Sequence, residues 1–223
     1  MNTDTWLVVP LYNEGTVVGD VIRHARETFS KIVCVDDGSA DNSAEIARDA
    51  GAVVVTHPVN LGQGAALQTG ITYVLGDPEM KYVVTFDSDG QHRTEDAERM
   101  VQRMRTEDLD VILGSRFLDA KIEAGFMKRI VLRAAVLFER FTTKLKVTDT
   151  HNGLRVFARS AAEQIQIRQN RMAHGSEILQ EIARHNLRYA EEPVHIVYTE
   201  YSRAKGQSLW NSVNILNELL LDR

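Results

Sequence analysis

The chain has a single cysteine and no long apolar run. Cys34 is alone among 223 residues, so a disulfide framework is excluded and a reducing cytoplasm is the expected setting. No stretch reaches the roughly 20 apolar residues that a membrane-spanning helix needs. The polar residues 1–5 show no signal-peptide pattern. We therefore expect a chain that does not cross a membrane by itself but is able to lie on one.

Two common nucleotide-binding motifs are also missing. No Gly-Lys-Ser/Thr follows the glycine-rich segment 60–64, which excludes a Walker loop. No Gly-x-Gly-x-x-Gly follows the first expected strand, which argues against a dinucleotide-binding Rossmann domain. The composition, 43% hydrophobic and 26% charged, is typical of a globular protein with one large domain.

Strand and helix signals alternate along the chain. Strands are predicted at residues 6–9, 31–35, 52–56, 82–86, 111–113 and 194–197, and helices at residues 14–28, 39–50, 64–75 and 94–105. This alternation predicts an α/β fold with a mostly parallel central sheet flanked by helices. Ligands of such sheets bind beyond the carboxyl ends of the strands. Polar or glycine-rich segments follow the first four strands, at residues 10–14, 36–39, 60–64 and 87–92.

The most informative of these segments carries Asp87 and Asp89, directly after a buried strand. Two carboxylates that face one cleft repel each other, and Mg²⁺ or Mn²⁺ removes that cost while bridging to a diphosphate. The alternative is a solvated turn whose acids cap the next helix. His92 fits either a metal ligand or an exposed neighbour. The neighbour is favoured, because hard cations prefer oxygen and Gln91 offers a carbonyl.

The other segments each fit two interpretations. One of Asp36 and Asp37 is expected to cap the following helix, and the other to accept hydrogen bonds from a nucleobase imide or ribose hydroxyls. The Asn60-x-Gly62-x-Gly64 segment is either an ordinary helix start or a place where backbone approaches a phosphate or ribose. Four such segments at one sheet edge favour a shared site over four unrelated turns.

Taken in order, these segments resemble the family 2 glycosyltransferases of the GT-A fold. The resemblance rests on residues 8–14 (VVPLYNE), 35–41 (VDDGSAD), 60–64 (NLGQG) and 87–92 (DSDGQH). Within the family the chain is most similar to the polyprenyl-phosphate, dolichyl-phosphate mannose synthase-like branch. The grounds are the Asp-x-Asp-x-Gln-His set, Gly114-Ser115-Arg116 and residues 149–155 (DTHNGLR). Relatives often read Ser-Gly-Phe-Arg where this chain reads Asn152-Gly153-Leu154-Arg155.

The resemblance implies one GT-A catalytic domain over residues 1–223, with a nucleotide-sugar-binding half, 1–115, and an acceptor-binding half, 116–223. The nucleotide is expected to contact Pro10, Tyr12, Glu14, Asp37, Gly62, Asp87, Ser88, Arg203 and Lys205. The metal, Mg²⁺ or Mn²⁺, is expected at Asp87, Asp89 and Gln91. The acceptor phosphate is expected at Arg116, Arg129, Arg133 and Arg155. Asp89 and Arg116 are expected to be catalytic, together with Asp149 and Glu177 as bases for an acceptor that needs one.

The second half of the chain is basic. Residues 116–155 hold nine Lys and Arg against four acids, a balance of +5 in a chain of net charge −5. Apolar residues between 127 and 145 recur at helical spacing, which predicts a basic amphipathic helix. This helix either packs on the core with a solvated basic face or lies on an anionic membrane. Nucleic acid is not an expected partner, because no recognition motif and no exposed stacking aromatics are present.

The C-terminal region adds a cationic loop and a second amphipathic helix. Arg203 and Lys205 lie on a Gly-containing loop that either closes over a diphosphate or is solvated surface. The helix expected at residues 209–221 packs on the domain, on the membrane, on a second copy of the chain or on a small membrane-protein subunit.

Three functions remain open from the sequence. The first is inverting, metal-dependent transfer of a hexose from a UDP- or GDP-sugar to a polyprenyl phosphate, by a peripheral enzyme at the cytoplasmic membrane face. The second is transfer to a sugar hydroxyl in cell-envelope polysaccharide or glycolipid assembly. The third is a non-catalytic nucleotide-sugar-binding assembly protein, against which the complete Asp-x-Asp-x-Gln set argues.

Overall fold

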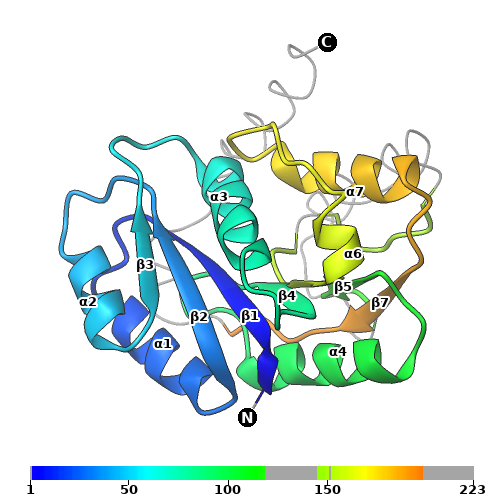
Figure 1. Cartoon of the computed structure of the whole chain (residues 1–223), viewed down its shortest axis with the longest axis horizontal. Helices are drawn as coiled ribbons and strands as arrows, with labels where there is room; N and C mark the ends of the chain where they lie inside the picture. Colours follow the sequence, from blue (N-terminus) through cyan, green and yellow to red (C-terminus); the bar gives the residue numbers. More distant parts are fainter. Residues whose placement is uncertain (1, 119–144, 151, 198–223) are drawn as a thin grey trace, which may run out of the picture.

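A seven-stranded sheet forms the centre of the part of the chain that the computed structural model describes, which is residues 2–118, 145–150 and 152–197 (Figure 1). Its strands are β1 (Asn2–Leu11), β2 (Phe29–Asp36), β3 (Val53–Thr56), β4 (Tyr82–Thr85), β5 (Val111–Ser115), β6 (Arg155–Ala158) and β7 (Tyr189–Pro193). The helices are α1 (Val18–Arg26), α2 (Ser43–Asp49), α3 (Gln63–Leu75), α4 (Thr94–Thr106), α6 (Arg159–Ala162) and α7 (His174–Arg184).

The sheet has the strand order β3-β2-β1-β4-β6-β5-β7. β1 pairs in parallel with β2 and β4, β2 with β3, and β5 with β7, so the mostly parallel sheet is confirmed. β6 alone runs antiparallel to both of its neighbours, β4 and β5. The first residue of β6, Arg155, is therefore placed opposite Thr85 of β4 and Leu113 of β5, close to the carboxyl edge of the parallel strands.

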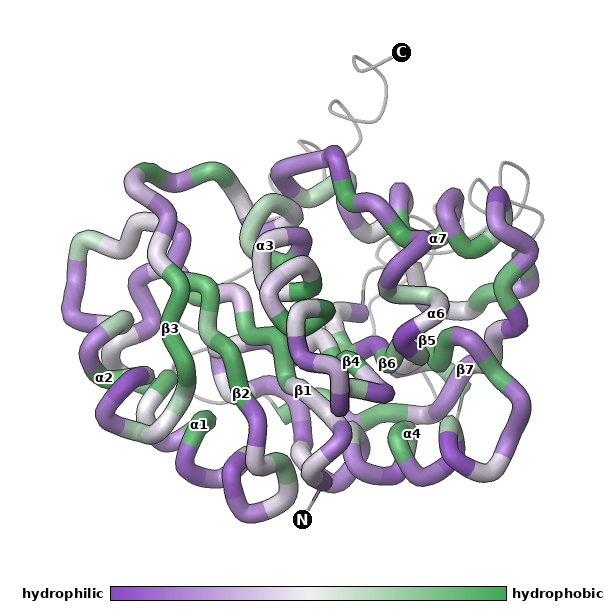
Figure 2. The backbone as a smooth tube through the Cα atoms, in the orientation of Figure 1, coloured by the Kyte–Doolittle hydropathy of each residue, from purple (hydrophilic) through white to green (hydrophobic). Residues whose placement is uncertain are grey.

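Two apolar clusters cover the two faces of the sheet. Leu7 and Val9 of β1 point into one cluster with α1 and α4, whereas Val8 points into the other with α3 and α7. This alternation follows from the two-residue period of a strand. Figure 2 shows the apolar stretches along the central strands. The sheet is thus buried on both faces, and its carboxyl edge is left for polar side chains.

Two helices begin later than the sequence pattern predicts. The helix expected at residues 14–28 starts at Val18, because Asn13 adopts a left-handed backbone with φ of 54° and Glu14 begins a turn. The helix expected at residues 39–50 starts at Ser43. Ser39 instead accepts a hydrogen bond from the Asn13 backbone N–H at 2.9 Å, and Ala40 donates to Asn13 Oδ1 at 2.8 Å. The two loops therefore fasten each other beyond β1 and β2.

The strand expected at residues 194–197 is misplaced by five residues. The strand that joins the sheet is β7, whose Glu191 and Glu192 conceal it from a search for apolar alternation. Glu192 is paired with Arg99 and Arg103 of α4. Residues 194–197 continue past the sheet, where Ile196 forms an isolated bridge with His92. β6, α6 and α7 were not predicted from the pattern.

No helix among the residues that the structure describes is long and apolar enough to span a bilayer. Two expected helices fall largely outside the described residues. The basic amphipathic helix lies mostly between 118 and 145, and the C-terminal helix lies after 197.

Candidate active site

Asp87 is held in a fixed orientation just beyond β4. Its Oδ2 lies 2.8 Å from His92 Nε2, and its Oδ1 accepts a hydrogen bond from Gln63 Nε2 of α3 at 3.1 Å. The backbone of Gly153 lies against the same carboxylate, so a Cβ there would collide with it and come within 2.8 Å of Oδ1. His92, five residues along the chain, and the distant residues Gln63 and Gly153 therefore surround this carboxylate, and a side chain at residue 153 would displace it.

The two carboxylates of the Asp-x-Asp segment differ in their acidity. Burial acts to raise the pKa of Asp87, but His92, together with the charges of His174 and Arg155, holds the pKa below its ordinary value. The pKa of Asp89 is raised by burial and by the negative charges of Asp87 and Glu14. Opposite shifts in adjacent acids are typical of a functional site. A divalent cation between them would remove the repulsion.

His92 is not an exposed neighbour, contrary to the sequence-based prediction. The residue is 8% exposed, its ring packs edge-on against Phe86 at 5.5 Å between centroids, and its backbone bridges Ile196. Neither His92 nor Gln63 was among the predicted site residues. The sequence signal for His92 was its position next to Gln91, but its burial depends on a segment about a hundred residues later.

If Asp87 holds a metal ion as the sequence predicts, replacement of His92 with phenylalanine should weaken Mn²⁺ binding by about 10- to 100-fold, the usual effect of removing a hydrogen-bond partner of a metal ligand. Phenylalanine keeps the ring contact with Phe86 but cannot donate to Asp87. His92→Gln, which restores a donor, should recover part of the affinity. Electron paramagnetic resonance titration with Mn²⁺ measures it, and His24→Phe at an exposed position of α1 is the control. Unchanged affinity in His92→Phe would contradict the positioning of Asp87 by His92.

Arg116 and Asp149 form a bidentate ion pair at the end of β5. Arg116 Nε lies 2.6 Å from Asp149 Oδ2 and Nη2 lies 2.8 Å from Oδ1, and the Arg116 backbone N–H also donates to Oδ2. The Asp149 side chain is 1% exposed, whereas that of Arg116 is 28% exposed. The structure thus unites two predicted site residues. Asp149 holds the Arg116 side chain in place, and the Asp149 carboxylate oxygens are shielded from solvent.

Glu177, the second predicted base, is engaged with backbone. Its Oε2 accepts hydrogen bonds from the N–H groups of Arg168 and Gln169 at 2.9 and 2.7 Å. The side chain comes from the first turn of α7. It anchors the loop that precedes this helix.

Arg155, the first residue of β6, is a buried cation in the field of Asp87 and Asp149. The residue is 3% exposed, and its Nη1 has no hydrogen-bond partner among the described residues. Burial lowers the pKa of Arg155 to about 10, while Asp87 and Asp149 act to raise it. Because it is still protonated at neutral pH, Arg155 places a positive charge within the field of Asp87 and of the Asp149–Arg116 pair.

Asp37 is already heavily hydrogen-bonded within the protein. Its Oδ1 lies 2.7 Å from His57 Nδ1 and accepts from the Leu61 backbone N–H, and its Oδ2 accepts from the Gly62 N–H at 2.7 Å. His57 is fixed in turn by Thr69 of α3 at 2.9 Å. Asp37 therefore shapes the β3–α3 loop, and its contact with a nucleotide stays a prediction.

Gly62 of the β3–α3 loop and Gly64 in the first turn of α3 make room for another part of the chain. A Cβ at Gly62, where φ is 106°, would collide with the carbonyl of Asn170, and one at Gly64 would collide with that of Gln169. The Gly64 N–H donates to Asn170 O at 2.8 Å. The backbone that approaches these glycines is thus the loop before α7. The Asn170 carbonyl of that loop accepts hydrogen bonds at the N-terminus of α3.

The remaining predicted residues lie around the same edge or outside the described ranges. Pro10 is buried in β1, Tyr12 is exposed, and Glu14 and Ser88 are buried. Gln91 donates its backbone N–H to Asp89 Oδ1 at 3.0 Å. Among the described residues, no group of three or more His, Cys, Asp or Glu is arranged to hold a metal. Arg129, Arg133, Arg203 and Lys205 lie outside the described residues.

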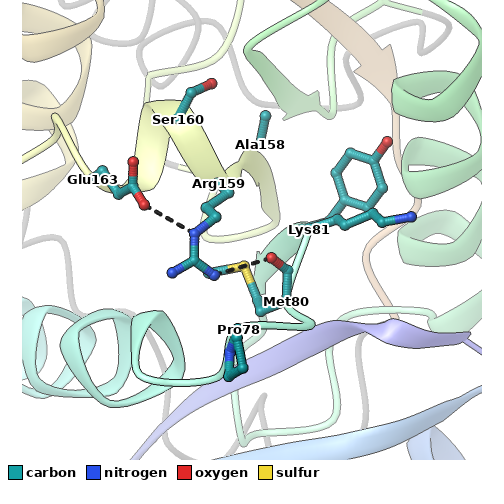
Figure 3. A pocket seen from close by; sticks show the side chains of 8 residues that line it. Pro78, Met80, Lys81, Ala158, Arg159, Ser160 and Glu163 are labelled. Carbon is teal, nitrogen blue, oxygen red and sulfur yellow. Dashed lines mark hydrogen bonds and ion pairs between the residues drawn. The ribbon is translucent and has the colours of Figure 1, made fainter.

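A hollow of about 500 Å³ lies at the opposite edge of the sheet, lined by Pro78, Met80, Lys81, Tyr82, Ala158, Arg159, Ser160 and Glu163 (Figure 3). Arg159 donates to the carbonyls of Leu75, Asp77 and Met80 and pairs with Glu163. Its guanidinium therefore closes the C-terminal end of α3. The hollow is part of the packing around that helix end and is remote from Asp87 and Asp89.

The fold and this group of residues agree with a comparison against known families. A family model described as Glycosyl transferase family 2 matches residues 6–166. The chain is a family 2 glycosyltransferase. This match confirms the family that the sequence motifs predicted.

Relatives of this glycosyltransferase include enzymes named for polyprenyl-phosphate substrates. An uncharacterised protein of Methanocaldococcus jannaschii is 36% identical over 99% of this chain and 92% of its own length. UDP-N-acetylglucosamine–dolichyl-phosphate N-acetylglucosaminyltransferase of Methanococcus voltae is 30% identical over 97% of this chain and 94% of its own length. Undecaprenyl-phosphate 4-deoxy-4-formamido-L-arabinose transferase of Pseudomonas aeruginosa is 29% identical over 95% of this chain and 61% of its own.

A solved structure confirms the GT-A fold of this glycosyltransferase. Glucosyl-3-phosphoglycerate synthase from Mycobacterium tuberculosis, crystallised with Mn²⁺, uridine diphosphate and phosphoglyceric acid, matches with a TM-score of 0.72 at 16% identity. The match covers 98% of this chain and 78% of the synthase.

Proposed function

We propose that this glycosyltransferase moves a hexose from a nucleotide sugar to a polyprenyl phosphate with inversion at the anomeric carbon. The single observation that carries the proposal is the state of the two candidate bases. Asp149 is buried in a bidentate pair with Arg116, and Glu177 accepts two backbone N–H groups. Both carboxylates thus have structural partners, whereas a sugar hydroxyl would need a base to remove its proton.

An acceptor that is already an anion fits the charges at this edge. A lipid phosphate attacks without losing a proton, and it is attracted by arginines. Arg116 is partly exposed and held in place by Asp149, so it presents a preoriented guanidinium next to the site. Arg155 adds a buried positive charge. Arg129 and Arg133 remain predicted contributors. The names of the relatives, which refer to dolichyl and undecaprenyl phosphates, support the same acceptor class.

The donor is proposed to lie across the tips of β1, β2 and β4. Asp87, Asp89 and Gln91 would hold Mg²⁺ or Mn²⁺, which supplies positive charge to the departing diphosphate when it is bound. The residues fit such an ion, because the negative charge of Asp87 raises the pKa of Asp89, and the two carboxylates offer the oxygen ligands that a hard cation prefers. Arg203 and Lys205 are proposed to add positive charge to the same diphosphate.

The reaction then requires a single displacement. An acceptor phosphate oxygen forms the new bond to the anomeric carbon as the bond from that carbon to the β-phosphate oxygen breaks, and the electron pair leaves with the nucleotide diphosphate. Arg116 holds the attacking phosphate, and Asp149 holds Arg116. Attack from the face opposite the leaving group inverts the configuration. We place this reaction at the cytoplasmic face of the membrane, in one catalytic domain spanning residues 1–223.

The test is transfer from labelled UDP- and GDP-sugars to undecaprenyl phosphate in detergent, with Mg²⁺ or Mn²⁺ and with a chelator. Label that appears in the organic phase and disappears with the chelator supports the proposal and identifies the donor. Label that stays in the aqueous phase while nucleotide is released would contradict the lipid acceptor and favour a sugar hydroxyl.

A further inference from the structure

Exposed apolar side chains gather on two loops at the N-terminal end of α3. The β3–α3 loop carries Val59 and Leu61, which are 59% and 42% exposed, and the loop before α7 carries Met172, which is 45% exposed. Figure 2 shows the apolar stretches on the β3–α3 loop. Large apolar side chains left in water near one another indicate an interaction surface. We call residues 58–62 and 168–172 together the loop pair.

The loop pair is built as one unit. The Asn170 carbonyl accepts hydrogen bonds from the N–H groups of Gly64 and Ala65, and Gly62 lies against Asn170 and the Arg171 side chain. Asp37 fixes the first loop through Leu61 and Gly62, and Glu177 fixes the second through Arg168 and Gln169. Both loops lie at the same end of α3 (Figure 1). The exposed apolar residues are therefore held in a defined relative position.

The charge of the loop pair has one sign. Its ten residues contain Arg168 and Arg171 and no acid, in a chain of net charge −5. Both arginines are exposed, and neither forms an ion pair with a described residue. An apolar tip bordered by arginines and free of acids matches the interface of an anionic bilayer, where apolar side chains enter the acyl boundary and cations meet headgroups.

We propose that the loop pair is a docking surface for an anionic lipid membrane. The choice of partner rests on the proposed function, whose acceptor is a membrane lipid. Docking through these loops turns the carboxyl edge of the sheet, with Asp87 and Asp89, toward the bilayer. The loops that follow β3 and precede α7 would thus set the distance between the active site and the lipid headgroups.

The experiment is flotation of the full chain with vesicles of phosphatidylcholine alone or with phosphatidylglycerol, without nucleotide sugar or polyprenyl phosphate. The triple variant Val59→Ser, Leu61→Ser, Met172→Ser should bind anionic vesicles at least about tenfold more weakly. The double variant Arg168→Gln, Arg171→Gln should lose about fivefold per arginine on anionic vesicles only. The matched control is Val53→Ser, Tyr73→Ser, which removes exposed apolar groups elsewhere, at 41% and 44% exposure.

A second readout does not depend on the strength of binding. Cys34 is fully buried, and burial raises its pKa to about 12, so its thiol should not react with a labelling reagent. A thiol-reactive fluorophore added to the Met172→Cys variant therefore labels position 172 alone. Its emission should shift to the blue with anionic vesicles, while the same label at Tyr73→Cys should not. Wild-type flotation of the triple variant would overturn the proposal. The proposal would also be overturned if the wild type bound no vesicles but self-associated with rising concentration, and if the triple variant abolished that self-association. That result would assign the surface to a second copy of the chain.

The two proposals fail separately. Vesicles that contain no substrate report docking alone, and the transfer assay in detergent needs no bilayer. Loss of docking in the triple variant together with normal transfer in detergent would support the loop pair and leave the catalytic residues unaffected.

Discussion

Replacement of Asp89 with alanine is expected to reduce sugar transfer by about a thousandfold or more. A metal ion contributes several kcal/mol to stabilising a departing diphosphate, and each 1.4 kcal/mol corresponds to about a factor of ten in rate. Asp87 already has His92 and Gln63 on its two oxygens, whereas Asp89 has a backbone N–H on Oδ1. Asp89 is therefore the carboxylate with more capacity for a cation. Steady-state transfer at saturating Mg²⁺ or Mn²⁺ measures the loss.

The same substitution should leave the fold intact, which separates this effect from unfolding. Because the pKa of Asp89 is raised in the folded protein, the folded state holds the proton more tightly than the unfolded state. The free energy of unfolding of the metal-free protein is therefore lowered as pH rises from the ordinary carboxylate pKa through the raised value. At neutral pH Asp89→Ala and Asp89→Asn should be at least as stable as the wild type, and they should lack that part of the pH dependence.

Asp20→Ala is the matched control, because this aspartate of α1 has a side chain that is 85% exposed. It should keep wild-type transfer and metal response. Full activity of Asp89→Ala in the presence of metal would refute the assignment of Asp89, and a strong loss of stability would show that Asp89 has a structural role instead.

The second large effect is expected at the Arg116–Asp149 pair. Arg116→Met should lower kcat/KM about a hundredfold, since a hydrogen bond to a charged group contributes roughly 1.5–3 kcal/mol. Asp149→Asn should cost about tenfold, because it loosens Arg116 without removing it. The double variant should be no worse than Arg116→Met alone. Such non-additivity is the mark of two residues that act as one unit.

Arg116→Met also removes the bidentate guanidinium partner of the buried Asp149 carboxylate, which is expected to cost about 3 kcal/mol of stability. Arg116→Lys keeps the charge and is the variant to use if Arg116→Met does not fold. It should retain more activity than methionine but less than wild type, because lysine cannot form the bidentate pair. If Asp149 were a general base, Asp149→Asn would lose nearly all turnover and the basic limb of the pH profile, while Arg116→Lys would stay active.

The strand ends and the Asp-x-Asp segment could be predicted because they depend on local patterns. A buried apolar run followed by acids identifies β4 and Asp87 without any distant contact. The positions of the first four strands follow in the same way. β7 could not be predicted from a local pattern, because its two glutamates break the apolar alternation. Their partners, on α4 and at Thr148, are far away in the sequence.

Residue roles that depend on partners far away in the chain could not be predicted from the sequence. Asp37 is fixed by His57 and Leu61, which lie 20 and 24 residues away, and Gly62 is required by a carbonyl of the loop before α7. Asp149 has the sequence context of a base, but its partner Arg116 stands 33 residues earlier. In each case the residue type indicated a functional site, and the three-dimensional partner defined what the side chain does there.

β5 is flanked by strands that are synthesised after it. Its neighbours in the sheet are β6 and β7, which begin at Arg155 and Tyr189. During translation the strand Val111–Ser115 has no partner until at least forty further residues have been made, and β4 has one open edge for the same interval. A nascent chain released at residue 115 would expose both edges of β5 and one edge of β4, and unpaired edges promote aggregation. We therefore expect that residues 1–115 do not fold alone in an expression experiment, and that a split version has to be made by co-expression of both fragments.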